Sequence, residues 1–186
     1  MKEIIVSLLF SVFLNINCYA QDKFIFHSQN FAGLLEGQAG SAFQLQTING
    51  VQKNGWFSGI GTGLDYYRFR SIPLFLNISK FLFSGQKFFV SGNGGVNFPW
   101  LKSEASGWNI ISVNYPASFF FEPGIGYKIG KSKSGNGVMI NAGYSYKHIR
   151  ENYQVTNPCT NSPCPELYEI YDYRLRRVSL KIGYMF

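Results

Sequence analysis

The stretch that decides the fold is RRVSLKIGYMF (176–186), the last residues of the sequence. Apolar or aromatic residues occupy every second position, and polar or small residues lie between them. The apolar set is Val178, Leu180, Ile182, Tyr184 and Phe186. A period of two is that of a β-strand with one apolar and one polar face. The rest of the sequence has to indicate which of these two faces meets water.

The first residues predict export. MKEIIVSLLFSVFLNINCYA (1–20) has a lysine near its start, an apolar run from Ile4 to Leu14 and a small residue at Ala20. This order is typical of a secretory signal peptide, cleaved after Ala20. The apolar run is shorter than the about 20 residues that a transmembrane helix needs. Cys18 leaves a lipoprotein anchor as the alternative, although the residues before it match that pattern poorly. Residues 21–186 then form one domain.

The composition is typical of strands that are apolar on one face only. Aromatic residues make up 18% of the 186 residues, charged residues 15%, and 20 residues are glycine. The net charge is +7, but the basic residues are scattered apart from Arg174, Arg176 and Arg177. An exported chain has little access to nucleic acid, so we expect no nucleic-acid partner. We also expect no cofactor.

Alternating segments separated by turn residues predict eight strands. They cover 30–38, 41–48, 55–69, 71–83, 87–98, 118–130, 137–149 and the closing stretch. The connections 49–55, 84–86 and 131–136 are short and rich in Gly, Asn and Ser, whereas 100–117 and 151–172 are long. Short turns at one end and long loops at the other are typical of outer-membrane barrels. Counting back from residue 186 places both long loops at the end opposite the two termini.

The distribution of side chains favours a membrane barrel over a soluble one. A soluble eight-stranded barrel has its apolar face inward, and a membrane barrel has it outward. The apolar set here is bulky, with aromatics near the strand ends, as in aromatic girdles. The expected girdles are Tyr66, Phe98 and Tyr146 at one rim, and Phe88, Tyr127 and Phe186 at the other. Residues 178–186 would rise ~20 Å at a tilt of about 40°, close to the apolar band of an outer membrane.

We therefore predict an all-β, eight-stranded antiparallel up-and-down transmembrane β-barrel in the outer membrane, with both termini in the periplasm. Its expected surroundings are outer-membrane lipid, and we expect a monomer.

The closing pattern also resembles the recognition signal of bacterial outer-membrane barrels. This resemblance implies that the barrel-insertion machinery reads Phe186, Tyr184, Ile182 and Leu180 during assembly. In addition, INGVQKNGWFSGIGTGLDYYRFRSIPLFLNISK (48–80) is similar to a segment of small outer-membrane β-barrel proteins of Bacteroidetes-type bacteria, OmpA/OmpW-like in having eight strands. The likeness extends loosely over 24–186. It implies fold and location, and no particular activity.

The charged residues of the polar face are expected in the lumen. They are Glu36, Asp65, Glu122, Lys128, Lys147 and Lys181. One interpretation is a plug of paired charges and amides, and the other is a narrow channel or carrier for small, apolar solutes. Eight strands leave an interior just wide enough for side chains, which favours the plug. Buried charges then need partners, and both signs are present.

Two cysteines in NPCTNSPCP (157–165) are the sharpest local motif. Cys159 and Cys164 lie in an exported loop, so we expect a disulfide between them. A metal site would need more ligands, and the histidines His27 and His148 lie elsewhere. The glycine-rich GIGTG (59–63) lacks the strand–loop–helix context of a phosphate-binding loop, so we assign it to packing of the barrel wall.

An enzyme that acts on lipids is a weaker alternative. Its base would be His148, and the possible nucleophiles are Ser112, Ser118 and Ser145. No Gly-x-Ser-x-Gly motif accompanies them. We therefore expect a protein without enzymatic activity, whose long loops have a structural or surface-binding role.

Overall fold

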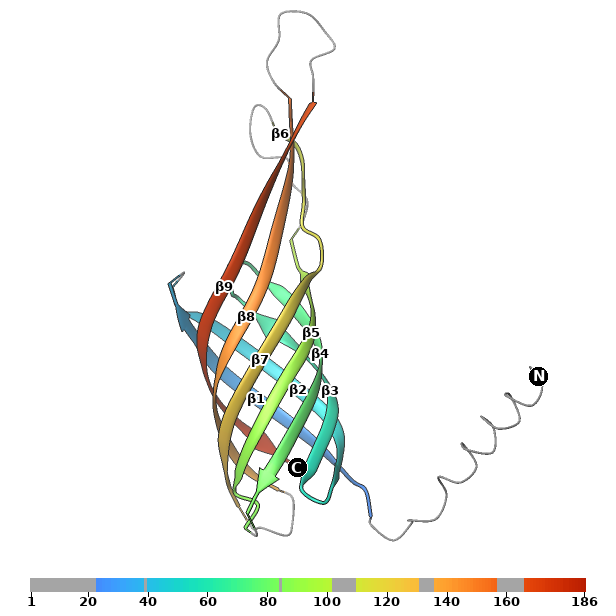
Figure 1. Ribbon diagram of the computed structural model, residues 1–186, viewed down its shortest axis with the longest axis vertical. Helices are drawn as coiled ribbons and strands as arrows, with labels where there is room; N and C mark the ends of the chain where they lie inside the picture. The colour runs from blue at the N-terminus through green and yellow to red at the C-terminus, as the bar shows by residue number, and fades with distance from the viewer. Residues whose placement is uncertain (1–22, 39, 84, 102–109, 131–135, 157–165) are drawn as a thin grey trace, which may run out of the picture.

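The computed structural model describes residues 23–38, 40–83, 85–101, 110–130, 136–156 and 166–186, and these form nine β-strands. The strands are β1 (Ile25–Gly37), β2 (Ala42–Lys53), β3 (Trp56–Asp65), β4 (Ser71–Leu82), β5 (Phe88–Pro99), β6 (Ile110–Asn114), β7 (Ser118–Ile129), β8 (Gly137–Thr156) and β9 (Glu166–Met185). Apart from β6, which pairs with β8, the strands pair in the order of the sequence, with β5 next to β7. Strand β9 closes the barrel by pairing with both β8 and β1. The predicted all-β, eight-stranded, antiparallel up-and-down barrel is confirmed (Figure 1). Among the described residues, no helix is long and apolar enough to cross a membrane.

The beginning of β1 and the end of β9 lie together at the lower end of the barrel (Figure 1). Ser28 and Phe186 exchange two backbone hydrogen bonds, of 2.8 and 3.0 Å. The β2–β3 turn at this end is only Asn54 and Gly55, with φ of 51° and 75°. Two positive φ values in an Asn-Gly pair are typical of a type I′ hairpin turn. Strand β2 therefore continues through Lys53, which corrects the expected turn over 49–55.

The two strands β8 and β9 continue far beyond the upper rim, where loops were expected (Figure 1). They stay paired up to Thr156 and Glu166, whereas the β1–β9 pairing ends at Gly37 and Arg177. Strand β6 pairs with this extension and was not predicted. Most of this part of β9 is exposed on both faces. Alternation fades where both faces of a strand meet water, which is why the sequence pattern missed it.

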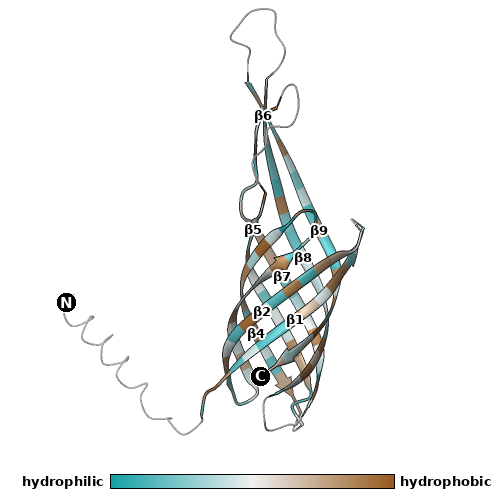
Figure 2. Cartoon of the chain, turned by 180° about the vertical axis from the view of Figure 1, so that it is seen from behind, coloured by the Kyte–Doolittle hydropathy of each residue, from teal (hydrophilic) through white to brown (hydrophobic). Residues whose placement is uncertain are grey.

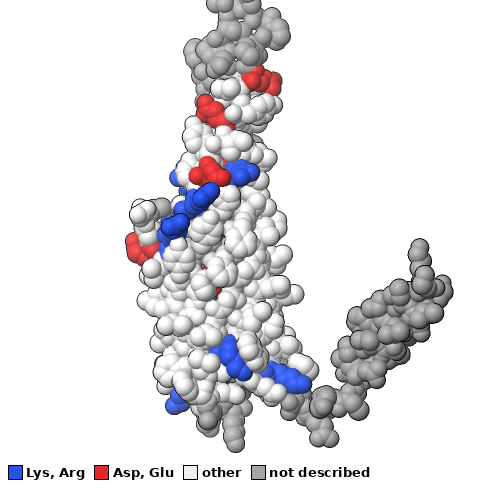
Figure 3. All heavy atoms as spheres, in the orientation of Figure 1, with Lys and Arg blue, Asp and Glu red and all other residues white. Residues whose placement is uncertain are grey.

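The barrel is apolar outside, as the alternation predicts. Residues Ile60, Leu76, Ile125 and Val178 all face outward, with 61–66% of each side chain exposed. Apolar and polar residues alternate along the strands (Figure 2). On the face in Figure 3, charged atoms lie mainly below and above a wide uncharged band. At the lower end, Lys53 ends β2, Lys80 lies near the end of β4, and Lys87 precedes β5. The Lys80 ammonium lies 4.6 Å from the centre of the Trp56 ring.

Inside the barrel, phenylalanine rings pack against glycines of the neighbouring strand. Phe75 of β4 covers Gly61 of β3, Phe89 of β5 covers Gly126 of β7, and a Cβ at either glycine would collide with the ring. Phe31 covers Gly183 in the same way. These glycines thus make room in the narrow lumen for large rings, a packing function that agrees with the assignment of GIGTG to the wall.

Replacing Gly61 by alanine is expected to destabilise the barrel by about 1–3 kcal/mol, because the new methyl group overpacks the Phe75 ring. The measurement is urea unfolding in phospholipid vesicles, followed by tryptophan fluorescence. Gly92→Ala is the matched control, since a Cβ at Gly92 meets nothing within 4 Å. Equal stabilities of the two variants would contradict the proposed ring–glycine packing.

Candidate functional site

The lumen is the candidate site that the sequence singles out, and its inward-facing side chains are almost completely buried. One part is an apolar cluster with no member more than 6% exposed, namely Phe31, Ile48, Phe57, Phe75, Phe81, Phe89, Phe120, Met139 and Met185. The other part is a polar network of charged groups and amides. The side chains of both parts are therefore largely shielded from solvent.

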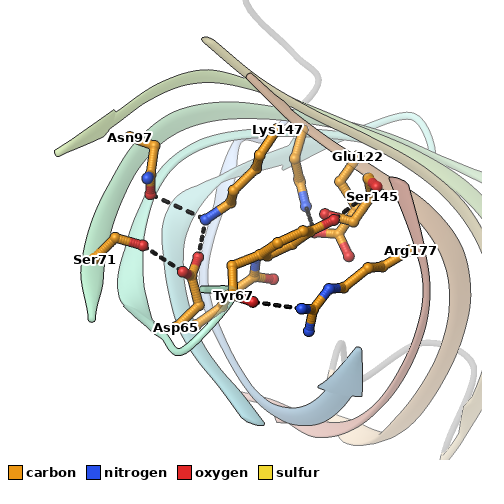
Figure 4. Close-up of polar contacts among 10 residues, drawn as sticks. Asp65, Tyr67, Ser71, Asn97, Glu122, Ser145, Lys147 and Arg177 are labelled. Atoms are coloured by element: carbon orange, nitrogen blue, oxygen red, sulfur yellow. Dashed lines mark hydrogen bonds and ion pairs between the residues drawn. The ribbon is translucent and has the colours of Figure 1, made fainter. Parts of the chain in front are cut away.

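The first ion pair of the network involves Asp65, the last residue of β3, and its contacts are drawn in Figure 4. Lys147 of β8 donates to Asp65 at the end of β3, and both side chains are completely buried. The Lys147 ammonium also donates to Asn97 Oδ1 at 3.0 Å, and the Ser71 hydroxyl donates to Asp65. Strands β3, β4, β5 and β8 therefore each contribute one polar group, which satisfies the requirement that buried charges be paired.

The second ion pair joins β7 to β9. Lys181 Nζ lies 3.1 Å from Glu122 Oε1, and the two side chains are 4% and 1% exposed. Gln46 donates to Glu122 Oε2 at 3.1 Å and accepts from Lys181 at 3.1 Å. Asn93 donates to the same carboxylate at 3.3 Å. The pair therefore holds four strands together across the lumen.

Two residues of the network were missed by the sequence analysis. The Arg177 guanidinium stacks over the Tyr67 ring at 4.4 Å and donates to the Tyr67 carbonyl. The Tyr67 hydroxyl donates to the Ser145 carbonyl at 2.8 Å (Figure 4). Arg177 lies on the same polar face of β9 as Lys181, so the alternation could have predicted its position in the lumen. Tyr67 follows the end of β3, where the period of two no longer applies.

Of the six charged residues expected in the lumen, five are buried there. Asp65, Glu122, Lys147 and Lys181 belong to the two ion pairs, and Lys128 is 1% exposed. The Lys128 ammonium lies 5.1 Å from the centre of the Phe81 ring and has no hydrogen-bond partner within the described part of the chain.

The sixth residue expected in the lumen, Glu36, lies outside it. It is exposed, lies opposite Val178 and accepts a hydrogen bond from Ser41. Its neighbour Leu35 is completely buried instead and clusters with Ala42 and Tyr67. The adjacent leucines Leu34 and Leu35 break the alternation, so the sequence pattern could not assign the faces of β1 correctly.

The residues of the expected insertion signal all face outward. Leu180 and Ile182 are 59% exposed, Tyr184 is 47% exposed and Phe186 is 56% exposed. The expected disulfide of Cys159 and Cys164 and the signal peptide lie outside the described residues.

Within the described residues, none of Ser112, Ser118 and Ser145 is a hydrogen-bond partner of His148. His148 is partly exposed and bonds to Asp172, whereas Ser145 is completely buried. The Ser112 hydroxyl donates to Gln154 at 3.0 Å, and Ser118 is buried. Within the described residues, no group of three His, Cys, Asp or Glu side chains could hold a metal ion.

Ion pairs also surround the upper rim. Asp172 bonds to His148 and lies 3.5 Å from Arg150, and Arg68 lies 3.0 Å from Glu151. Partial desolvation raises the pKa of the Asp172 carboxyl, but His148 and Arg150 lower it more, so the pKa lies below its ordinary value. Asp172 therefore stays ionised around neutral pH, and the rim has fixed charges of both signs.

Comparisons with known proteins returned one similar structure. No family model matches the sequence, and the search of curated proteins found no match. The crystal structure of the outer membrane protein OprG from Pseudomonas aeruginosa is similar to this chain with a TM-score of 0.48 and 14% sequence identity. The alignment covers 87% of this chain and 93% of that chain.

Proposed function

We propose that this chain is an integral outer-membrane β-barrel with a closed lumen, which holds the β8–β9 extension outside the cell for a structural or surface-binding role. The observation that carries the proposal is the inverted distribution of side chains. The outer wall exposes aliphatic and aromatic groups all round, while the charged groups of the wall are buried inside. Such a distribution is unfavourable in water and favourable in a bilayer.

The rims support the same orientation in a membrane. Aromatic side chains lie at both ends of the apolar wall, for example Tyr66 at the upper rim, 47% exposed, and Phe88 at the lower rim, 53% exposed. Basic residues lie next to them, where cations reach lipid headgroups. The export signal expected at residues 1–20 and the similarity of 48–80 to Bacteroidetes-type barrels agree with this location. The barrel-insertion machinery would be the assembly partner, and the barrel would be a monomer.

The extension supports a binding role at the surface. Above the rim, β9 exposes a group of large side chains, namely Leu167, Tyr168, Ile170 and Tyr171, each with 46–68% of its surface accessible. Exposed aromatic and aliphatic groups on a rigid hairpin are typical of protein-binding surfaces. The hydrolytic alternative lacks a bonded base and nucleophile, because the His148 ring bonds to Asp172 and to none of the three serines within the described residues.

Two measurements on the purified full chain test the proposal. Unboiled protein in phospholipid vesicles is expected to migrate faster on SDS gels than boiled protein. Planar bilayers containing it are expected to show no steady single-channel steps, because buried side chains fill the lumen. Identical migration would contradict the membrane barrel, and steady conductance steps would favour the narrow channel instead.

A further inference from the structure

The outer surface has a notch where β1 ends and β9 continues. The β1–β9 pairing stops at Gly37 and Arg177, but β9 continues to Glu166 paired with β8. A cavity of about 690 Å³ lies beside this step, and its lining includes Arg68, Arg174, Arg176 and Arg177. The Arg177 guanidinium stacks over Tyr67 inside the lumen. The step in strand length therefore leaves three exposed cations at the upper rim, those of Arg68, Arg174 and Arg176.

Two of these three cations are available to a ligand. Arg174 and Arg176 are exposed and make no hydrogen bond or ion pair with another described residue. Arg68, in contrast, pairs with Glu151 at 3.0 Å. The carboxylate of Glu36 also lines the notch, and it accepts a hydrogen bond from Ser41. The notch thus has a surplus of positive charge, and planar guanidinium groups suit phosphate oxygens.

The lower edge of the notch is continuous with the apolar wall. Val178, which is 62% exposed, and Tyr144, which is 43% exposed, line this edge. Farther down the same wall, an apolar groove of about 660 Å³ is lined by Ala32, Leu45 and Ile182, among others. Val178 and Ile182 are separated by ~13 Å along the strand. A cationic notch above an apolar groove matches a molecule with an anionic head and a hydrocarbon tail.

We propose that the notch binds the phosphate group of a phosphorylated glycolipid of the outer leaflet, with one acyl chain of that lipid in the groove. This inference rests on the proposed function, because the upper rim reaches the outer leaflet only if the barrel spans the outer membrane with its termini in the periplasm. Arg174 and Arg176 hold the phosphate, and Val178 and Ile182 contact the chain.

The test measures lipid binding to the purified full chain by native mass spectrometry in a zwitterionic detergent. The probe is a hexa-acylated glucosamine disaccharide bisphosphate, and its enzymatically dephosphorylated form is the comparison. The double variant Arg174→Gln/Arg176→Gln is expected to bind the phosphorylated probe about tenfold more weakly than the wild type, because two charge-assisted contacts are lost. Both proteins are expected to bind the dephosphorylated probe equally. Lys53→Gln/Lys87→Gln, at the opposite rim, is the matched control and is expected to bind like the wild type.

A second variant tests the groove. Ala32→Trp fills it and is expected to weaken binding of the acylated probe, with no effect on a deacylated disaccharide phosphate. Equal binding of the phosphorylated probe by the wild type and the arginine variant would overturn the inference. It would also be overturned if inorganic phosphate alone bound as tightly as the lipid, since the notch would then be a site for free phosphate.

Heat-modifiable migration of each variant separates this inference from the proposed function. Variants that insert into vesicles but bind alike contradict only the lipid site. A wild-type chain that does not insert contradicts both.

Discussion

Lys147→Met is expected to lower the free energy of unfolding by about 3–5 kcal/mol, because it leaves the Asp65 carboxylate buried without its counter-ion. Both side chains are completely buried, and Ser71 is the other side chain that donates to Asp65. Methionine retains the length of the lysine stem, so the loss reports on charge more than on volume. Urea unfolding in phospholipid vesicles, followed by tryptophan fluorescence, measures it.

Two controls make this result specific. Asp65→Asn added to Lys147→Met removes the orphaned charge and is expected to recover part of the stability. Arg150→Met breaks an exposed pair, 3.5 Å from Asp172, and is expected to cost less than about 1 kcal/mol. A loss of the latter size for Lys147→Met would mean that water reaches the pair, and the closed lumen would be contradicted.

Phe120→Ala is also expected to have a large effect and to lower the free energy of unfolding by about 3–5 kcal/mol. The Phe120 ring is completely buried, packs edge-on against Phe75 at 5.6 Å and lies 5.1 Å below the Lys147 ammonium. Removing it leaves a cavity inside the lumen, and the rigid barrel wall cannot move inward to fill it. The same unfolding experiment measures the loss.

The adjacent residue provides the matched control. Phe119 is 54% exposed on the outer wall, so Phe119→Ala removes the same ring from the lipid-facing side. The decrease in the free energy of unfolding of this variant is expected to be clearly smaller, because lipid chains take the place of the ring. Equal losses for the two variants would show that the interior is no better packed than the surface, contrary to the plug.

The barrel could be predicted because the two faces of its wall differ, the outer face being apolar and exposed and the inner face being buried and partly polar. A strand with an apolar environment on one side and a polar, packed interior on the other has to alternate, so residues 178–186 and seven similar segments stood out. The same alternation placed Asp65, Glu122 and Lys147 together on the inner face. The β2–β3 turn was expected over 49–55, but it consists of Asn54 and Gly55 alone.

The errors have physical reasons of the same kind. Glu36 was placed inside because the adjacent leucines 34 and 35 obscure the parity of β1. The extension of β8 and β9 was taken for loops because the β9 part is exposed on both faces and does not alternate. The ring–glycine contacts of the lumen join neighbouring strands at positions such as Phe75 and Gly61, which a pattern along one strand cannot relate.

The sequence by itself determined the period of the strands, the two faces of the wall and the number of strands in the barrel, because these follow from residue type and local spacing. Only the tertiary structure decided which charges pair, since Lys147 and Asp65 are 82 residues apart and meet through barrel closure. It also decided where the notch lies, because the step between Gly37 and the continuing β9 depends on the register of strands from opposite ends of the chain. Register is a property of paired strands, and no single strand encodes it.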